Sequence, residues 1–197
     1  TITHHSTSTS TSTSTPTHNS DEPIVVGDGT GTTYNFPIDN YWNYSCTEQI
    51  YLASEIGTAG TINSISFYYN YGTEYTCSNV TMYMKNVSRS SFESTSDYEP
   101  LSANDIVWTG NIAPTGAGWY TFTLTTPFEY DGTSNLLVAF HDGTSGYPGS
   151  SYTWRRTTSP SSAYMALSYY SDSSNPDPYN LEAYDNLEAY DNYKQTY

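Results

Sequence analysis

The sequence predicts an all-β protein, an antiparallel sandwich of about eight to ten strands with an extended N-terminal arm and a C-terminal tail. Short segments rich in aromatic and β-branched residues recur along the chain, and Gly, Pro and Asn separate them. No segment up to residue 170 convincingly repeats its apolar residues at the spacing of an amphipathic helix. At 197 residues the chain can bury one ordinary sandwich core, so we expect one domain with extensions.

The clearest strand signal lies in residues 118–142, GWYTFTLTTPFEYDGTSNLLVAFHD. In its first part bulky residues alternate with threonines, which is the period of a strand with one face in a core. The pair Asp131-Gly132 favours a tight reversal, and the apolar run that follows is typical of a strand in the middle of a sandwich. We expect this segment to form the central antiparallel hairpin, with Trp119 and Trp108 in the core.

The remaining elements follow in chain order. The first apolar run, Ile24-Val25-Val26, predicts a short strand that closes the sheet or is lent to a partner. Residues 34–44 are expected to be irregular, and 88–102 to form a loop with one helical turn. Further strands are expected at 48–52, 61–69, 79–85, 106–109, 152–157 and 163–170.

A set of short motifs recurs among these segments: Pro127-Phe128, Tyr130-Asp131-Gly132, Asn135-Leu136-Leu137-Val138, His141-Asp142, and the segments 45–57, 60–69 and 79–85. Together they are similar to a module found in secreted and cell-surface proteins of Bacteroidota-type bacteria, related to the jelly-roll adhesin domains of their large surface proteins. The resemblance spans residues 24–170 and implies a jelly-roll sandwich, a secreted protein and a structural calcium ion.

Composition divides the chain into three parts. Residues 1–22 alternate Ser and Thr and have almost nothing to bury, so we expect an extended arm that is glycosylated or docked on a neighbouring copy. Residues 23–171 are expected to form the sandwich. Residues 172–197 begin as a turn-rich linker and contain NLEAYD twice in succession, which suits a short helix, an adhesive arm or a tolerated duplication.

The charge of the chain excludes several classes of partner. A net charge of −15, with 5 Lys and Arg against 20 Asp and Glu, leaves no basic surface to bind nucleic acid. No apolar run is long enough to span a bilayer. The chain has 22 Tyr and few Lys, a profile that suits a wet extracellular surface, although the preference of strands for aromatic residues also accounts for the tyrosines. We expect an extracellular or cell-surface protein.

Candidate site residues are loop acids, sequons and cysteines rather than catalytic groups. The pair Cys46 and Cys77 predicts one disulfide, because an even count in a secreted chain favours pairing. The loop acids Asp28, Asp131 and Asp142, together with Asp39, offer the oxygen ligands that Ca²⁺ prefers. Candidate glycosylation positions are Thr7, Thr9, Thr11, Thr13, Thr15, Asn43, Asn79 and Asn86.

The function expected from these features is structural. We find no nucleophile motif, paired-acid motif or cofactor motif in the sequence, so we expect a protein that is not an enzyme. The leading hypothesis is a subunit of an extracellular fibre that polymerises with copies of itself, head to tail, through the arm and Ile24 to Val26. The alternative is a carbohydrate-binding or adhesin module, and exposed tryptophans among Trp42, Trp108, Trp119 and Trp154 would favour it.

Overall fold

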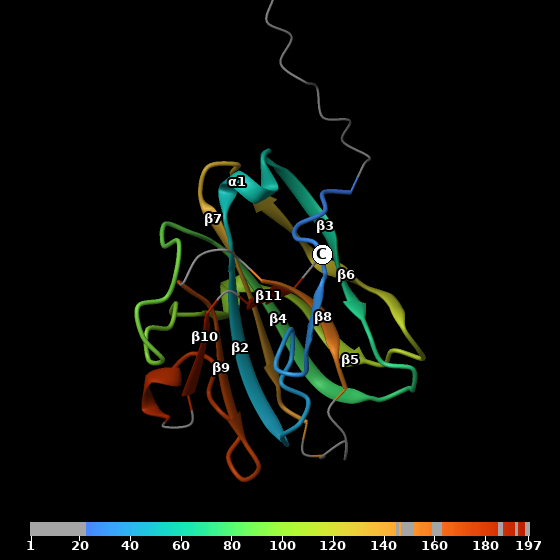
Figure 1. Cartoon of the computed structure of the whole chain (residues 1–197). Helices are drawn as coiled ribbons and strands as arrows, with labels where there is room; N and C mark the ends of the chain where they lie inside the picture. The colour runs from blue at the N-terminus through green and yellow to red at the C-terminus, as the bar shows by residue number, and fades with distance from the viewer. Residues whose placement is uncertain are drawn as a thin grey trace, which may run out of the picture.

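The computed structural model describes residues 23–144, 146, 152–158, 163–184, 187–191 and 193–195. The expected arm 1–22, with Thr7, Thr9, Thr11, Thr13 and Thr15, lies outside these residues. Two antiparallel sheets pack face to face (Figure 1), so the prediction of an all-β sandwich is confirmed. The finer jelly-roll topology stays a prediction.

The chain crosses repeatedly between the two sheets. In the five-stranded sheet the order is β1 (Gly31–Thr33), β8 (Trp154–Thr158), β3 (Gly60–Tyr69) and β6 (Gly118–Tyr130), and β11 (Tyr193–Gln195) also pairs with β8. In the six-stranded sheet the order is β10 (Leu187–Asp191), β9 (Tyr164–Ser171), β2 (Tyr44–Tyr51), β7 (Asn135–Asp142), β4 (Cys77–Val87) and β5 (Ile106–Ile112). A short helix α1 (Ala53–Ile56) follows β2, and 3-10 turns lie at Ala103–Asp105 and Leu181–Ala183.

Every strand predicted from residue 48 onward is present, but the prediction of a central hairpin is wrong. Strand β6 pairs with β3 in one sheet, and β7 pairs with β2 and β4 in the other. The Asp131 carboxylate accepts the backbone N–H groups of Thr133 and Ser134, both at 2.7 Å, and fixes the turn between the two strands. This turn therefore carries the chain from one sheet to the other instead of joining two paired strands.

The apolar run Ile24 to Val26 forms no strand, which corrects its assignment as an assembly strand. Val26 is only 2% exposed and belongs to the core between the sheets, and Ile24 packs against the same core. Val25 points away and is 62% exposed. The run covers the core of its own sandwich, so its burial stabilises the domain rather than an intersubunit contact.

Two apolar cores lie on opposite faces of the six-stranded sheet. The first fills the space between the sheets and includes Phe67, Phe122 and Phe140. The second lies on the outer face, where loop 88–102 and the segment 172–184 cover the sheet (Figure 1). Strand β7 contributes to both cores, since its residues 136–140 are all fully buried, which explains its continuous apolar run.

The two copies of NLEAYD adopt different structures. In the first copy, Leu181–Ala183 forms a 3-10 turn, and the Leu181 side chain is buried in the outer core. In the second copy, Leu187–Asp191 forms β10 and pairs with β9 at the edge of the six-stranded sheet. The tail thus extends the sandwich beyond residue 171, where we expected it to end.

Candidate functional site

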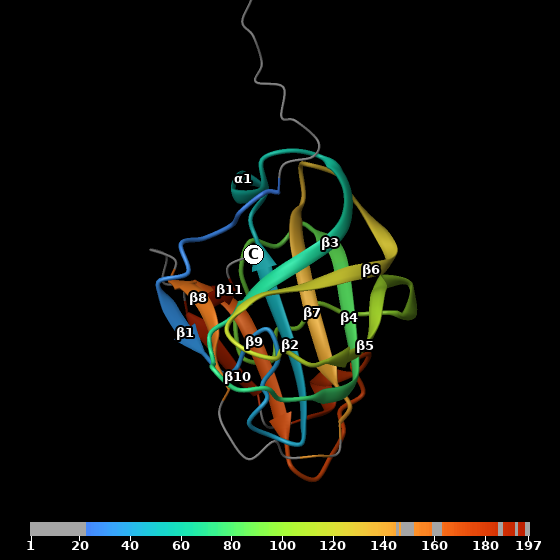
Figure 2. The same cartoon turned by 90° about the vertical axis from the view of Figure 1, so that its right-hand side faces the viewer.

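The outer face of the five-stranded sheet is open, in contrast to the covered outer face of the other sheet. In Figure 2, β3 and β6 lie in front of the six-stranded sheet, and no segment among the described residues crosses in front of them. The inward residues of β3 are Ile65, Phe67 and Tyr69. Because strand side chains alternate, the residues between them point outward, to this open face.

The outward residues of β3 and β6 face each other in cross-strand pairs. Tyr68 lies opposite Trp119, and Ser66 lies opposite Thr121, with their hydroxyl oxygens 2.8 Å apart. Ser64 and Thr123 form the next pair along the strands. The face therefore presents two aromatic rings at one end and a ladder of hydroxyl groups beside them.

Trp119 is 53% exposed, which corrects our assignment of this residue to the core. On β6 the inward series is Tyr120, Phe122 and Leu124, with Phe122 and Leu124 buried and Tyr120 packed against the core. Trp119 is in phase with the outward threonines instead. The alternation in the sequence contained this signal, but the size of the side chain suggested the opposite orientation.

The aromatic pair is continued by an arginine on the next strand. Strand β8 pairs with β3 through Trp154 and Tyr69, which places Arg155 beside Tyr68. The guanidinium carbon of Arg155 lies 3.9 Å from the centroid of the Tyr68 ring, a cation–π contact. The Arg155 Nε–H donates to Asn70 Oδ1 at 3.3 Å. We call Trp119, Tyr68, Arg155 and Asn70 the aromatic platform.

The other tryptophans do not extend this platform. Trp154 is fully buried, and Trp108 packs edge-on against Phe122 with ring centroids 5.0 Å apart. Trp42 stacks on Tyr170 at 4.5 Å near the start of β2. Trp119 and Tyr68 are inclined by 81°, so Trp119 offers a single stacking face rather than half of a coplanar pair.

A second polar site lies under loop 88–102, on the covered face of the six-stranded sheet. Glu48 of β2 is 1% exposed, and its Oε2 accepts the backbone N–H of Glu99 at 3.0 Å. Burial raises the pKa of Glu48 to about 8, because the ionised form would lose its hydration. Glu48 therefore holds its proton at neutral pH.

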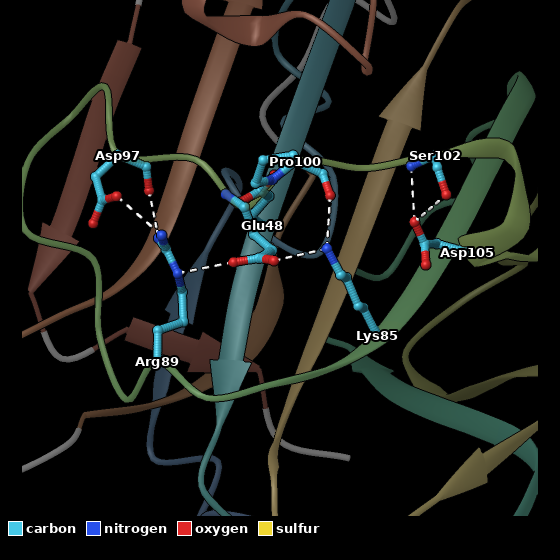
Figure 3. Close-up of polar contacts among 8 residues, drawn as sticks. Glu48, Lys85, Arg89, Asp97, Pro100, Ser102 and Asp105 are labelled. Atoms are coloured by element: carbon cyan, nitrogen blue, oxygen red, sulfur yellow. Dashed lines mark hydrogen bonds and ion pairs between the residues drawn. The ribbon is translucent and has the colours of Figure 1, made fainter.

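The loop above Glu48 is held by ion pairs that engage the nearby cations (Figure 3). The Lys85 ammonium lies 2.7 Å from one carboxylate oxygen of Glu99, and Arg89 Nε lies 3.0 Å from the other. Arg89 also contacts the Asp97 carboxylate at 3.1 Å. Among the described residues, the ion pairs of Lys85 and Arg89 are made with Glu99 and Asp97 and not with Glu48. The pairs therefore hold the loop closed, and burial keeps Glu48 neutral.

The expected calcium site is not assembled. Asp131 uses its carboxylate within its own turn, and hydrogen bonds from Ser134 and Thr133 hold its pKa at about 2. Asp28 accepts from Thr30, Asp39 is buried, and Asp142 accepts from Cys77. Within the described ranges, no three or more His, Cys, Asp or Glu side chains come together as a metal site. The acids Asp28, Asp131 and Asp142 are therefore separate loop-fixing groups.

The predicted disulfide is wrong, because both cysteines are free and buried. Cys46 on β2 packs in the outer core. Cys77 on β4 belongs to the core between the sheets, and its thiol donates to Asp142 Oδ2 at 3.1 Å. The two side chains lie on opposite faces of one sheet, so the geometry of a disulfide is out of reach. Burial raises the pKa of both thiols.

The sequon asparagines are engaged within the domain. The side-chain amide nitrogen of Asn43 donates to the Asp172 carbonyl at 2.8 Å, and that of Asn86 donates to the Glu129 carbonyl at 3.0 Å. Asn79 donates to the Gly143 carbonyl at 3.4 Å. A glycan would replace one of the two hydrogens on each of these nitrogens, so modification would have to be accommodated beside the bond that the nitrogen makes.

Comparison of the sequence with models of known protein families gives no match, and comparison with curated proteins gives none either. In the described part of the chain, no helix has the length and apolar character needed to cross a bilayer.

Proposed function

We propose that this protein is a non-catalytic carbohydrate-binding module whose contact surface is the open face of the five-stranded sheet. The observation that carries the proposal is the 53% exposure of Trp119 on that face. A large ring held in water on the edge strand β6 loses the gain of burial. Binding of a ligand would recover that gain.

The chemistry of the platform suits a sugar. The face of an indole ring is electron-rich, and the C–H groups on one side of a pyranose ring can pack against it. Sugar hydroxyl groups require hydrogen-bond partners, which the Ser66 and Thr121 pair and the Asn70 amide supply. An apolar surface for one face and polar groups around it are the two requirements of glycan recognition.

The fibre hypothesis requires Ile24 to Val26 to pair as a strand with another copy of the chain. Val26 and Ile24 pack on their own domain, so they are not free to complete the sheet of another copy. Assembly through residues 1–22, which lie outside the described residues, stays a prediction. The open aromatic face gives the binding function a specific surface, and the fibre hypothesis has no counterpart among the described residues.

The test is a glycan array followed by titration calorimetry on the glycans that bind. Trp119→Ala should weaken binding about tenfold or more, because truncating an aromatic anchor commonly costs roughly 2 kcal/mol. Tyr179→Ala is the matched control, since Tyr179 is 48% exposed in the segment that covers the other sheet. The glycan should also remain intact after incubation. Equal affinity of the wild type and Trp119→Ala for every bound glycan would reject the proposal.

A further inference from the structure

Arg155 is the charged group of the platform, and its contacts leave most of its donors available. Its Nε–H is bound to Asn70, and one face of its guanidinium lies on Tyr68. Within the described ranges, the terminal nitrogens of Arg155 donate to no hydrogen-bond acceptor. Arg155 also forms no salt bridge there, because the salt bridges of these residues are made by Lys85 and Arg89. In a chain with 5 basic and 20 acidic residues, a cation without an acidic partner is unusual.

The guanidinium is also fixed in orientation. Stacking on Tyr68 and the bond to Asn70 restrain its plane, so little side-chain freedom is left to lose on binding. A planar guanidinium with free terminal N–H groups matches a carboxylate, which can accept two parallel hydrogen bonds from it.

The spacing on the sheet suits a ligand of two linked rings. Trp119, Tyr68 and Arg155 lie on three adjacent strands, β6, β3 and β8. Neighbouring strands are about 4.8 Å apart, so Trp119 and Arg155 are separated by about 10 Å, comparable with the length of a disaccharide. One sugar ring can therefore stack on Trp119 while the next reaches Arg155.

Resting on the proposed carbohydrate-binding function, we infer that the platform selects glycans in which a neutral sugar is linked to a carboxylated sugar, with the carboxylate bound by Arg155. The net charge of −15 disfavours a continuous polyanion. At physiological salt, charges farther away than about 8 Å are largely screened, so a single carboxylate beside Arg155 is attracted by Arg155 more than it is repelled by distant acidic residues. The selected ligand thus carries an isolated acidic sugar rather than a run of them.

The experiment compares matched glycans printed as the free acid and as the methyl ester, which keeps the shape and removes the charge. The wild type should bind the acid roughly tenfold more tightly, as expected for a hydrogen-bonded charge pair. Arg155→Gln should lose this preference while it still binds the ester. Arg155→Lys should keep part of it, because the charge remains but the bidentate geometry is lost. Raising the salt should weaken only the binding of the acid.

Two results would overturn the inference. One is equal binding of acid and ester by the wild type, and the other is an acid preference that survives in Arg155→Gln. A third result separates the two proposals: esters and neutral glycans bind in a manner that depends on Trp119, and the acids do not bind in this way. The carbohydrate-binding function then stands, and the preference for an acidic sugar fails. If no glycan binds in either form, both fall. Urea unfolding of each Arg155 variant confirms that the fold is retained, and Arg155→Lys keeps the test interpretable if Arg155→Gln is unstable.

Discussion

Replacing Glu48 with glutamine should stabilise the protein at neutral and alkaline pH. In the folded chain burial raises the pKa of Glu48 from the ordinary value of 4.5 to about 8. In the unfolded chain the carboxyl ionises near its ordinary pKa, whereas the folded chain keeps the proton until about pH 8. The unfolded state therefore binds fewer protons across this window, and the stability of the wild type falls as the pH rises through it.

The magnitude follows from the width of the window. The interval between 4.5 and about 8 corresponds to a loss of roughly 5 kcal/mol, at about 1.36 kcal/mol per pH unit, and the full stability is present only below pH 4.5. Glutamine has the shape of the protonated acid and does not titrate. Glu48→Gln should be within about 1 kcal/mol of the wild type at pH 5 and more stable by roughly 3 kcal/mol at pH 7.

Urea unfolding at pH 5, 7 and 8.5 measures this difference, since the other titrating groups are common to both proteins and cancel. Glu93→Gln removes an exposed carboxyl from the same loop and controls for the change in net charge. A free-energy difference between the wild type and Glu48→Gln that stays constant from pH 5 to pH 8.5 would refute the reasoning. Glu48 would then be ionised in the folded protein.

Three further predictions concern packing and the thiols. Val26→Ala should lower the free energy of unfolding by about 1 to 3 kcal/mol, while Val25→Ala should leave it nearly unchanged, because only Val26 is buried. Phe67→Ala should cost about 3 to 5 kcal/mol in the same assay, since the ring is fully buried against two other phenylalanines. Cys46 and Cys77 should resist a thiol reagent in the folded protein and both react without reductant in denaturant.

Each of these predictions has a result that contradicts it. Equal losses for Val25→Ala and Val26→Ala would mean that the N-terminal run does not pack as described. A loss below about 1 kcal/mol for Phe67→Ala would place this ring outside a tight core. If the unfolded chain shows reactive thiols only after reduction, Cys46 and Cys77 are disulfide-bonded and the corrected assignment is itself wrong.

The strands could be predicted from the sequence because their signals are local. Alternation at a period of two and turn residues such as Asp131-Gly132 depend on neighbours along the chain. The pairing of strands depends on residues far apart, so the same turn was taken for a hairpin when it crosses between sheets. The two copies of NLEAYD make the point directly, since identical residues form a 3-10 turn in one place and a strand in the other.

The candidate site was less predictable for a related reason. Trp119 was visible in the sequence, but its orientation follows from the phase of the threonines, a weaker cue than its size. Arg155 could not have been found, because its meeting with Tyr68 requires β8 to pair beside β3. The buried acid Glu48 was hidden in the same way, since the loop residue that bonds to it, Glu99, lies 51 positions later in the chain.

The position of β2 has a consequence for synthesis of the chain. Ser45 on this strand pairs with Asp142 on one side and with Tyr170 on the other, so both neighbours of β2 are made long after it. At ribosomal rates, on the order of ten seconds pass before β7 and β9 emerge. During that interval Ile50 and Tyr51, which end up fully buried, have no partner strand to cover them. Chaperone contacts with the nascent chain should therefore concentrate at β2 and end only when β9 leaves the ribosome.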